Sequence, residues 1–227
     1  MAVTLSTLML STLMLSTVAW LLGAGHIWGR ITHRRSLAFW LKPLPIFLFI
    51  LIAALADPPI SPTYRAFIIA GLLFSAAGDV FLALPQDRFV WGLGSFLAAH
   101  LFYIAAFLSV GGFGFTWWIV LPALLYGAAM LAILWPHVAA GLRLPVAVYL
   151  AVILVMGWQA TEQWAVLRSP SALLGMVGAG FFIISDSVLA LNKFRGGFPG
   201  GSRGADVVIM LTYYAAQWLL ALSVQAQ

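Results

Sequence analysis

The sequence predicts an all-α integral membrane protein with eight transmembrane helices. Of its 227 residues, 63% are hydrophobic and 7% are charged, whereas charged residues make up about 25% of a soluble domain. A helix needs about 20 apolar residues to cross the hydrocarbon core of a bilayer. Eight segments meet this requirement and make residues 1–227 a single transmembrane domain: Thr4–Gly25, Leu37–Ala56, Ala66–Leu84, Val90–Val110, Phe115–Trp135, Leu144–Ala160, Ser171–Asn192 and Ala205–Val224.

The first segment lacks the basic residues that open a signal peptide, and its apolar run is too long for one, so we expect a membrane span there. In the second segment we expect Pro43 and Pro45 to lie in the first helical turns, where a missing N–H is tolerated. The sixth segment is the shortest. Residues that favour turns mark the joints: Asp57-Pro-Pro, Ser61-Pro, a polar turn at Pro85–Phe89, Gly111-Gly, Trp135-Pro, Ser169-Pro and the glycine-rich Arg195–Gly204.

The distribution of Lys and Arg predicts the orientation of the protein in the membrane. Nine of these residues lie at or next to the first, third, fifth and seventh joints, and two lie elsewhere, at Arg65 and Arg168. The positive-inside rule therefore places the odd-numbered joints in the cytoplasm and both termini outside it. The basic residues at the odd-numbered joints are Arg30, Arg34, Arg35, Arg88, Arg143, Lys193, Arg195 and Arg203, and the ninth, Lys42, lies just inside the second span.

Two aspartates stand out because each lies within an apolar segment. The chain has six acidic residues, and Asp79 is the only charged residue from Ala66 to Leu84. A carboxylate at the bilayer centre costs about 2.5–3.5 kcal/mol on insertion scales, so it is a candidate functional group. Asp186 lies in a matching context, Asp-Ser-Val-Leu-Ala-Leu against Asp-Val-Phe-Leu-Ala-Leu at Asp79. Both lie roughly 8–9 Å from the end predicted to be cytoplasmic, at 1.5 Å per residue.

Further similarities between the halves suggest an internal duplication. Ser95-Phe-Leu-Ala-Ala-His100 resembles Thr212-Tyr-Tyr-Ala-Ala-Gln217, and Leu44-Pro45 resembles Leu144-Pro145. We therefore expect two parallel four-helix repeats, residues 1–110 and 115–227, related by an axis along the membrane normal. Such an axis would make Asp79 and Asp186 face each other across the centre of the bundle.

Helical spacing gathers further polar side chains onto single faces of the predicted spans. These side chains are candidates for binding or orienting a substrate, although hydrogen bonding between helices is an equally good interpretation for most of them. Lys42 has three interpretations: it pairs with the carboxylates, holds a lipid phosphate, or extends towards the membrane surface. The candidates are Lys42, His100, Tyr103, Ser185, Tyr213 and Gln217.

Several chemistries are absent from the sequence. There is no cysteine, no G-x-S-x-G elbow, no H-E-x-x-H and no phosphate-binding G-x-x-x-x-G-K. We expect His100 to be the only histidine within a span, with His26, His33 and His137 at loops, so that a metal site with three protein ligands is not expected. We expect no cofactor, and no basic stripe indicates nucleic acid. Two buried carboxylates favour general acid–base chemistry, in which one holds a proton while the other is ionised.

In their order and spacing, these motifs resemble the YhhN family of membrane lysoplasmalogenases, from the second span to the eighth. The resemblance implies hydrolysis of the vinyl-ether bond of lysoplasmalogens, which gives a fatty aldehyde and glycerophosphoethanolamine or glycerophosphocholine. It also implies that Asp79 and Asp186 are the catalytic pair. The motifs are Lys42-Pro43, G-D-x-F-L at Gly78–Leu82, then Phe89, Gly92, Phe96, His100 and Tyr103, then Ser185-Asp186-Ser187 and Tyr213-Tyr214-x-x-Gln217.

This reaction suits the pair of acids. A vinyl ether is protonated at carbon and the resulting cation adds water, so one carboxylic acid and one carboxylate are needed, without a metal or a covalent intermediate. The expected partners are a lysophospholipid substrate and membrane lipid, and no protein partner is evident. The main alternative is a small-molecule or proton-coupled transporter with the same acids as a coupling site. A structural or sensor protein explains the matched aspartates least well.

Overall fold

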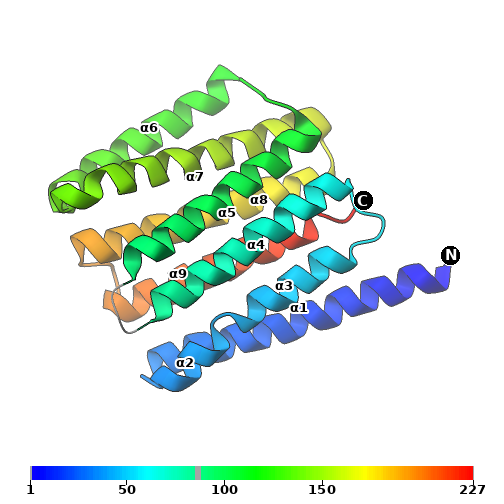
Figure 1. Cartoon of the computed structure of the whole chain (residues 1–227), viewed down its shortest axis with the longest axis horizontal. Helices are drawn as coiled ribbons and strands as arrows, with labels where there is room; N and C mark the ends of the chain where they lie inside the picture. Colours follow the sequence, from blue (N-terminus) through cyan, green and yellow to red (C-terminus); the bar gives the residue numbers. More distant parts are fainter. Residues whose placement is uncertain (1, 85–87, 227) are drawn as a thin grey trace.

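The computed structural model describes residues 2–84 and 88–226, and these residues form a bundle of antiparallel helices (Figure 1). Within this part of the chain the only β-structure is an isolated bridge between Pro59 and Gln225. The helices are α1 (Ala2–Ile31), α2 (Arg35–Leu41), α3 (Leu44–Leu55), α4 (Pro62–Ala83), α5 (Phe89–Gly111), α6 (Trp117–Leu134), α7 (Ala140–Leu167), α8 (Pro170–Ala190) and α9 (Gly201–Leu222), with a short 3-10 helix η1 (Trp135–His137) and a π-helical segment η2 (Leu191–Arg195).

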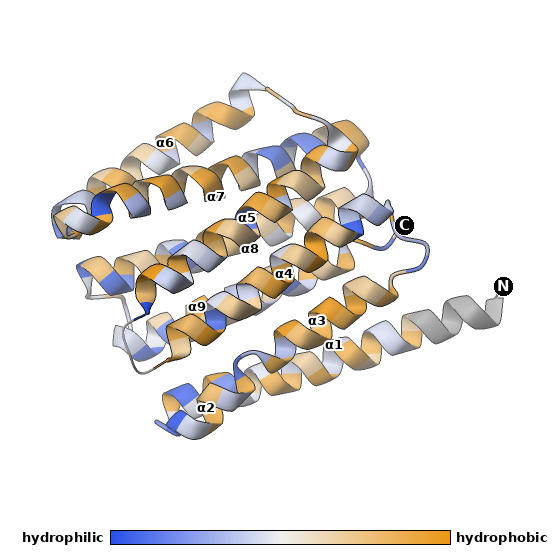
Figure 2. Ribbon diagram, in the orientation of Figure 1, coloured by the Kyte–Doolittle hydropathy of each residue, from blue (hydrophilic) through white to orange (hydrophobic). Residues whose placement is uncertain are grey.

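The all-α membrane class and the eight predicted spans are confirmed. Eight helical segments of the described chain are long and apolar enough to cross a bilayer, and each coincides with a predicted span. Polar residues gather near the ends of these helices, whereas their middle parts are mostly apolar (Figure 2). Helix α1 begins and α9 ends at the same end of the bundle (Figure 1). Of the turn predicted at Pro85–Phe89, residues 85–87 lie outside the described residues.

The second span differs from the prediction. Instead of one helix with Pro43 and Pro45 in its first turns, it consists of α2 and α3, which are separated at Lys42 and Pro43. Each proline lacks the N–H that would continue the helical hydrogen bonds. The interruption leaves the Lys42 carbonyl free of the helix, and it accepts a hydrogen bond of 3.1 Å from the Tyr214 hydroxyl. The break therefore places Lys42 at a bend inside the bundle.

The sixth span is also different, because α7 is 28 residues long and is not the shortest. Its polar end stays helical and buried because it binds the connection between α5 and α6. The Glu162 carboxylate accepts hydrogen bonds from the backbone N–H and the hydroxyl of Thr116, at 2.6 and 2.8 Å, and Gln159 bonds both backbone groups of Gly114. A search of the sequence for apolar runs does not detect such contacts.

The two halves of the chain pack in corresponding ways. Helix α4 packs on α5 as α8 packs on α9, and α3 packs on α4 as α7 packs on α8. Between the halves, α3 contacts α9 and α7 contacts α5. Both α4 and α8 begin with a Ser-Pro pair, in which the hydroxyl of Ser61 or Ser169 accepts a hydrogen bond from the backbone N–H three residues later. These correspondences support the proposal of two parallel repeats.

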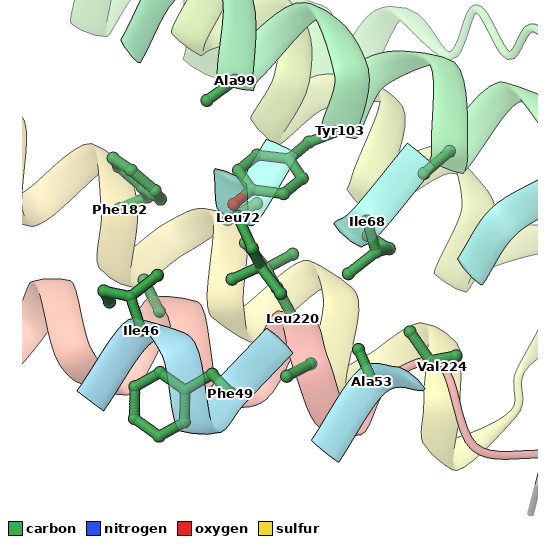
Figure 3. Packing of buried hydrophobic residues seen from close by; sticks show 14 of the residues in the cluster. Ile46, Phe49, Ala53, Ile68, Leu72, Ala99, Tyr103, Phe182, Leu220 and Val224 are labelled. Carbon is green, nitrogen blue, oxygen red and sulfur yellow. The ribbon is translucent and has the colours of Figure 1, made fainter. Parts of the chain in front are cut away.

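The core lies where α3, α4, α5, α8 and α9 meet, and it is filled by side chains such as Phe49, Leu72, Phe182 and Leu220 (Figure 3). Glycines allow α4 and α5 to approach closely. A methyl group at Gly71 would lie 2.2 Å from the Tyr103 ring, and one at Gly78 would lie 2.7 Å from the Phe96 ring. Gly71 and Gly78 are seven residues apart on α4, and Phe96 and Tyr103 are seven residues apart on α5. Two aromatic rings of α5 therefore fit against two glycines of α4. This close contact positions Asp79, the neighbour of Gly78.

Candidate active site

A polar cavity opens at the end of the bundle where the basic loops gather. Its volume is about 850 Å³. Both Asp79 and Asp186 lie on its wall, with Lys42, Ser185 and Tyr213. Helix ends and loops add further charged residues, namely Arg30, Arg35, Arg88, Lys193, Arg203 and Asp206. Thus six Lys and Arg side chains and three Asp side chains line this polar cavity.

Asp79 is buried in α4, and its carboxylate has partners from the break between α2 and α3 and from α9. Lys42 Nζ lies 3.1 Å from Asp79 Oδ1. The Tyr213 hydroxyl of α9 donates a hydrogen bond of 2.7 Å to Asp79 Oδ2. Of the three interpretations of Lys42, the ion pair with a carboxylate is the arrangement present in the structure, and only 12% of its side chain is exposed. An ammonium and a hydroxyl thus compensate for the burial of this carboxylate.

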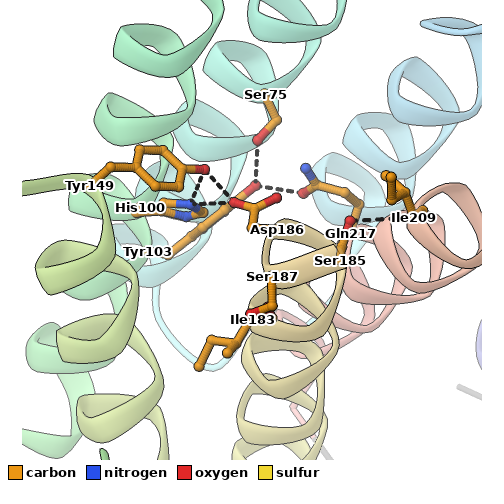
Figure 4. Close-up of polar contacts among 10 residues, drawn as sticks. All are labelled: Ser75, His100, Tyr103, Tyr149, Ile183, Ser185, Asp186, Ser187, Ile209 and Gln217. Atoms are coloured by element: carbon orange, nitrogen blue, oxygen red, sulfur yellow. Dashed lines mark hydrogen bonds and ion pairs between the residues drawn. The ribbon is translucent and has the colours of Figure 1, made fainter. Parts of the chain in front are cut away.

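Asp186 is the more exposed carboxylate, with 15% of its side chain accessible against 2% for Asp79. The Tyr149 hydroxyl of α7 donates a short hydrogen bond to Asp186 Oδ2. His100 Nε2 of α5 lies 3.5 Å from the same oxygen and 2.9 Å from the Tyr149 hydroxyl (Figure 4). Among the described residues, no Lys or Arg nitrogen lies within 4.0 Å of the Asp186 carboxylate, which distinguishes it from Asp79.

Phe182 separates the two groups of partners and packs against both. Its ring lies 4.6 Å from that of His100 and 5.6 Å from that of Tyr213, edge to face in each case. Phe96 packs against Phe182 and Tyr213 at 6.2 and 5.9 Å. Rings packed in this way restrict the orientations of His100 and Tyr213. The carboxylates are therefore held by one continuous packed unit.

The remaining predicted residues lie behind the cavity wall or bond to backbone. Tyr103 and Gln217 are fully buried, and the Tyr103 hydroxyl donates a hydrogen bond of 2.7 Å to Gln217 Oε1. Ser75 lies 3.4 Å from the same hydroxyl (Figure 4). The Ser185 hydroxyl donates a hydrogen bond to the Ile209 carbonyl and links α8 to α9. The hydrogen bonds of these residues thus connect α4, α5, α8 and α9 next to the carboxylates.

Tyr149 was missed by the sequence analysis, although one signal could have found it. It is the only polar side chain between Arg143 and Trp158. A single polar residue in such an apolar run has the same significance as Asp79 in α4. Tyrosine is also common near membrane interfaces, where its hydroxyl reaches water. Here the hydroxyl reaches Asp186 instead.

The expectation that His26 lies at a loop is wrong. It lies within α1, is 2% exposed, and its Nδ1 is 2.8 Å from the Tyr214 hydroxyl. The prediction failed because α1 extends six residues beyond the expected end at Gly25. Among the described residues, no group of three or more His, Asp or Glu side chains is placed to share a metal ion.

Comparison with known proteins identifies the family. Residues 37–224 match the family model described as the YhhN family.

The chain belongs to the YhhN family.

It is 39% identical over 196 residues to lysoplasmalogenase TMEM86A of Homo sapiens, which covers 81% of this chain and 76% of that protein. It is 34% identical over 166 residues to lysoplasmalogenase TMEM86B of Homo sapiens, covering 70% and 64% of the two chains. It is also 32% identical over 182 residues to the membrane protein YhhN of Escherichia coli O6:H1, covering 80% and 84%. No solved structure matches the chain.

The region matched by the YhhN family begins within α2 and ends just after α9, so it contains Lys42, Asp79 and Asp186. The resemblance stated from the motifs is thus confirmed for the spans that carry them. Helix α1 lies before the matched region, and its His26 and Arg30 also line the polar cavity.

Proposed function

We propose that this protein hydrolyses the vinyl-ether bond of lysoplasmalogens and releases a fatty aldehyde and a glycerophospho-alcohol. Two relatives that share more than 30% of their residues with it over most of its length are lysoplasmalogenases. The observation that carries the proposal is that Asp79 and Asp186 line one cavity, near the end of the membrane span. A substrate with its chain in lipid and its headgroup in water could meet both carboxyl groups there.

The proposed reaction needs two carboxyl groups in different protonation states. A carboxylic acid transfers its proton to the second carbon of the alkenyl chain, which leaves an oxocarbenium ion at the first carbon. Water adds to that carbon and gives its proton to the other carboxylate. The hemiacetal then collapses: its hydroxyl returns a proton to the first carboxyl group, and the bond between the first carbon and the ether oxygen breaks. The second carboxyl group passes the proton taken from water to the glycerol oxygen, and the aldehyde is released. One water molecule is consumed in total.

We further propose that Tyr149, His100, Lys42 and Tyr213 orient the carboxyl groups. Tyr149 and His100 hold Asp186, whereas Lys42 and Tyr213 hold Asp79. Preorganised partners of this kind restrict the carboxyl groups to one geometry before the substrate arrives. The difference in partners also gives the two carboxyl groups different environments, as an acid and a base require.

A transporter is the alternative function. In transporters with internal repeats, interrupted helices lie at corresponding positions in the two halves. Here α2 and α3 are interrupted at Lys42, but the corresponding α7 is continuous through Pro145. The interruption thus occurs in one half only, which favours the enzyme.

Purified protein incubated with a lysoplasmalogen tests the proposal directly. We expect free aldehyde to appear in proportion to the amount of protein, and Asp79→Asn protein purified in the same way to release almost none. Absence of aldehyde with wild-type protein that is folded would contradict the proposed function. Uptake of the intact lipid by proteoliposomes, without aldehyde, would favour the transporter.

A further inference from the structure

A second space, the apolar pocket, adjoins Asp186 on the side away from Asp79. It lies between α5, α6, α7, α8 and η2. Aliphatic and aromatic residues such as Leu93, Met130, Val146 and Leu150 form most of its wall. Helix α6, which lies beside α7 at the edge of the bundle (Figure 1), contributes Met130 and Leu134 to its wall.

The apolar pocket and the polar cavity share part of their walls. Asp186 lines both spaces, as do Leu82, Phe89, Phe96, Leu189 and Lys193, whereas Asp79 lines only the polar cavity. The ring of Phe89 packs edge to face on Phe194 at 5.8 Å, and Lys193 Nζ lies 4.7 Å from its centre. Asp186 therefore lies in a wall that the two spaces share.

The two spaces differ in chemistry in the way that the two ends of a lysophospholipid differ. The polar cavity carries six Lys and Arg side chains against three Asp side chains, and arginine binds phosphate through charge-assisted hydrogen bonds. The apolar pocket offers hydrocarbon side chains, against which a hydrocarbon chain loses its contact with water. An anionic headgroup fits the polar cavity, and a long chain fits the apolar pocket.

We propose that the apolar pocket holds the alkenyl chain of the substrate while the phosphate lies in the polar cavity. This proposal rests on the proposed function, which supplies the substrate. The linkage between chain and headgroup then lies at Asp186, where the two spaces meet. The carbons of the double bond belong to the chain, so they lie on the Asp186 side, and the glycerol oxygen lies on the Asp79 side.

This placement assigns different roles to the two carboxyl groups. Asp186 transfers its proton to the second chain carbon, whose double bond supplies the electron pair for the new C–H bond. Asp79 accepts the proton that water loses when it adds to the first carbon. Tyr149 also lines the apolar pocket and donates its hydrogen bond to Asp186, so it is a positioning residue for the proton donor.

Two neighbouring valines of α7 allow a matched test. Val146 lines the apolar pocket and is 7% exposed, whereas Val148 lies outside both spaces and is 43% exposed. Val146→Phe adds a ring to the pocket, and Val148→Phe adds the same ring to the outer surface. Both variants are compared with wild type by aldehyde release from a long-chain and a short-chain lysoplasmalogen.

We expect Val146→Phe to lower kcat/KM for the long-chain substrate by about tenfold or more, since a change of one or a few carbons in an apolar pocket changes discrimination by about 10–200-fold. The loss for the short-chain substrate should be smaller. Val148→Phe should leave both values unchanged. Equal losses for the two substrates, or no loss, would contradict the proposal. If Val146→Phe does not fold, Ala190→Leu fills the same pocket from α8.

A second readout separates this proposal from the proposed function. A lysophosphatidylcholine with a photoreactive diazirine at the end of its chain should label residues of α5–α8 around the apolar pocket. Val146→Phe should reduce this labelling. If wild type releases no aldehyde but the pocket is labelled, the proposed function fails and the chain site stands. Labelling that is confined to the outer surface, as for any membrane lipid, would overturn the chain site.

Discussion

Tyr213 of α9 donates a hydrogen bond of 2.7 Å to Asp79 of α4, and therefore links the last helix of one half to the third span of the other. Asp186 has the corresponding arrangement, because His100 reaches it from α5, the fourth span of the first half. Each carboxylate also has a partner on the span before its own, Lys42 for Asp79 and Tyr149 for Asp186. Each site is thus completed by a residue of the opposite half.

The two aspartates should act as one unit. We expect Asp79→Asn and Asp186→Asn each to lower kcat by about 10²–10⁴-fold, because Asn retains the size of the side chain but cannot transfer a proton. The double variant should be scarcely slower than either single variant, since groups that act together are not additive. Aldehyde release from purified variants measures this. Near-normal hydrolysis by either single variant would eliminate the paired-acid mechanism.

The rate should follow a bell-shaped dependence on pH. At low pH both carboxyl groups are protonated and no base remains, whereas at high pH both are ionised and no proton donor remains. The two limits belong to the coupled pair rather than to one residue. Measurement of kcat over a range of pH in which the protein stays folded tests this. A rate that rises or falls to a plateau with only one limit would contradict it.

Tyr149→Phe should lower kcat without unfolding the protein. Because Asp186 holds its proton before the reaction, this hydrogen bond joins neutral groups and contributes about 0.5–1.5 kcal/mol, so we expect a loss of about 2–10-fold. Tyr64→Phe is the matched control, because it also removes a buried hydroxyl, one that contacts Ser223 in a different part of the bundle. The control should retain its activity. Equal activities of the two variants would show that Tyr149 does not position Asp186.

Lys42→Met should destabilise the protein because it leaves Asp79 without its cation. Removal of one partner of a buried ion pair costs about 3–5 kcal/mol. The more exposed pair of Arg30 and Asp206 provides the control, since such pairs contribute about 0–1 kcal/mol. We expect thermal unfolding in detergent to show a much larger decrease for Lys42→Met than for Arg30→Met.

Addition of Asp79→Asn to Lys42→Met should restore part of the lost stability, because the unpaired carboxylate is then removed. A double variant that is less stable than Lys42→Met would indicate that Lys42 acts through contacts other than the ion pair.

The orientation of the protein in the membrane is also testable. From the distribution of Lys and Arg we predict that both termini face away from the cytoplasm and that the polar cavity opens near the cytoplasmic face. A reporter that is active only outside the cytoplasm should work when fused to the C-terminus, and one active only in the cytoplasm should fail. The opposite pattern would move the polar cavity to the other leaflet.

The sequence alone determined the membrane class and the eight spans, and it singled out Asp79 and Asp186 as candidate functional residues. These are local properties: hydropathy adds up over about 20 consecutive residues, and a charge in an apolar run is evident without its neighbours. Family membership could likewise be inferred from motifs, because their order along the chain is itself a sequence property.

Only the tertiary structure decided which residues meet the carboxylates. Tyr149 and Asp186 are 37 positions apart, and their contact depends on how α7 and α8 are rotated about their axes. The burial of His26, the bend at Lys42 and the polar end of α7 likewise depend on partners distant in the sequence. In a membrane both the lipid-facing and the core-facing sides of a helix are apolar, so hydrophobic periodicity does not reveal which side faces the site.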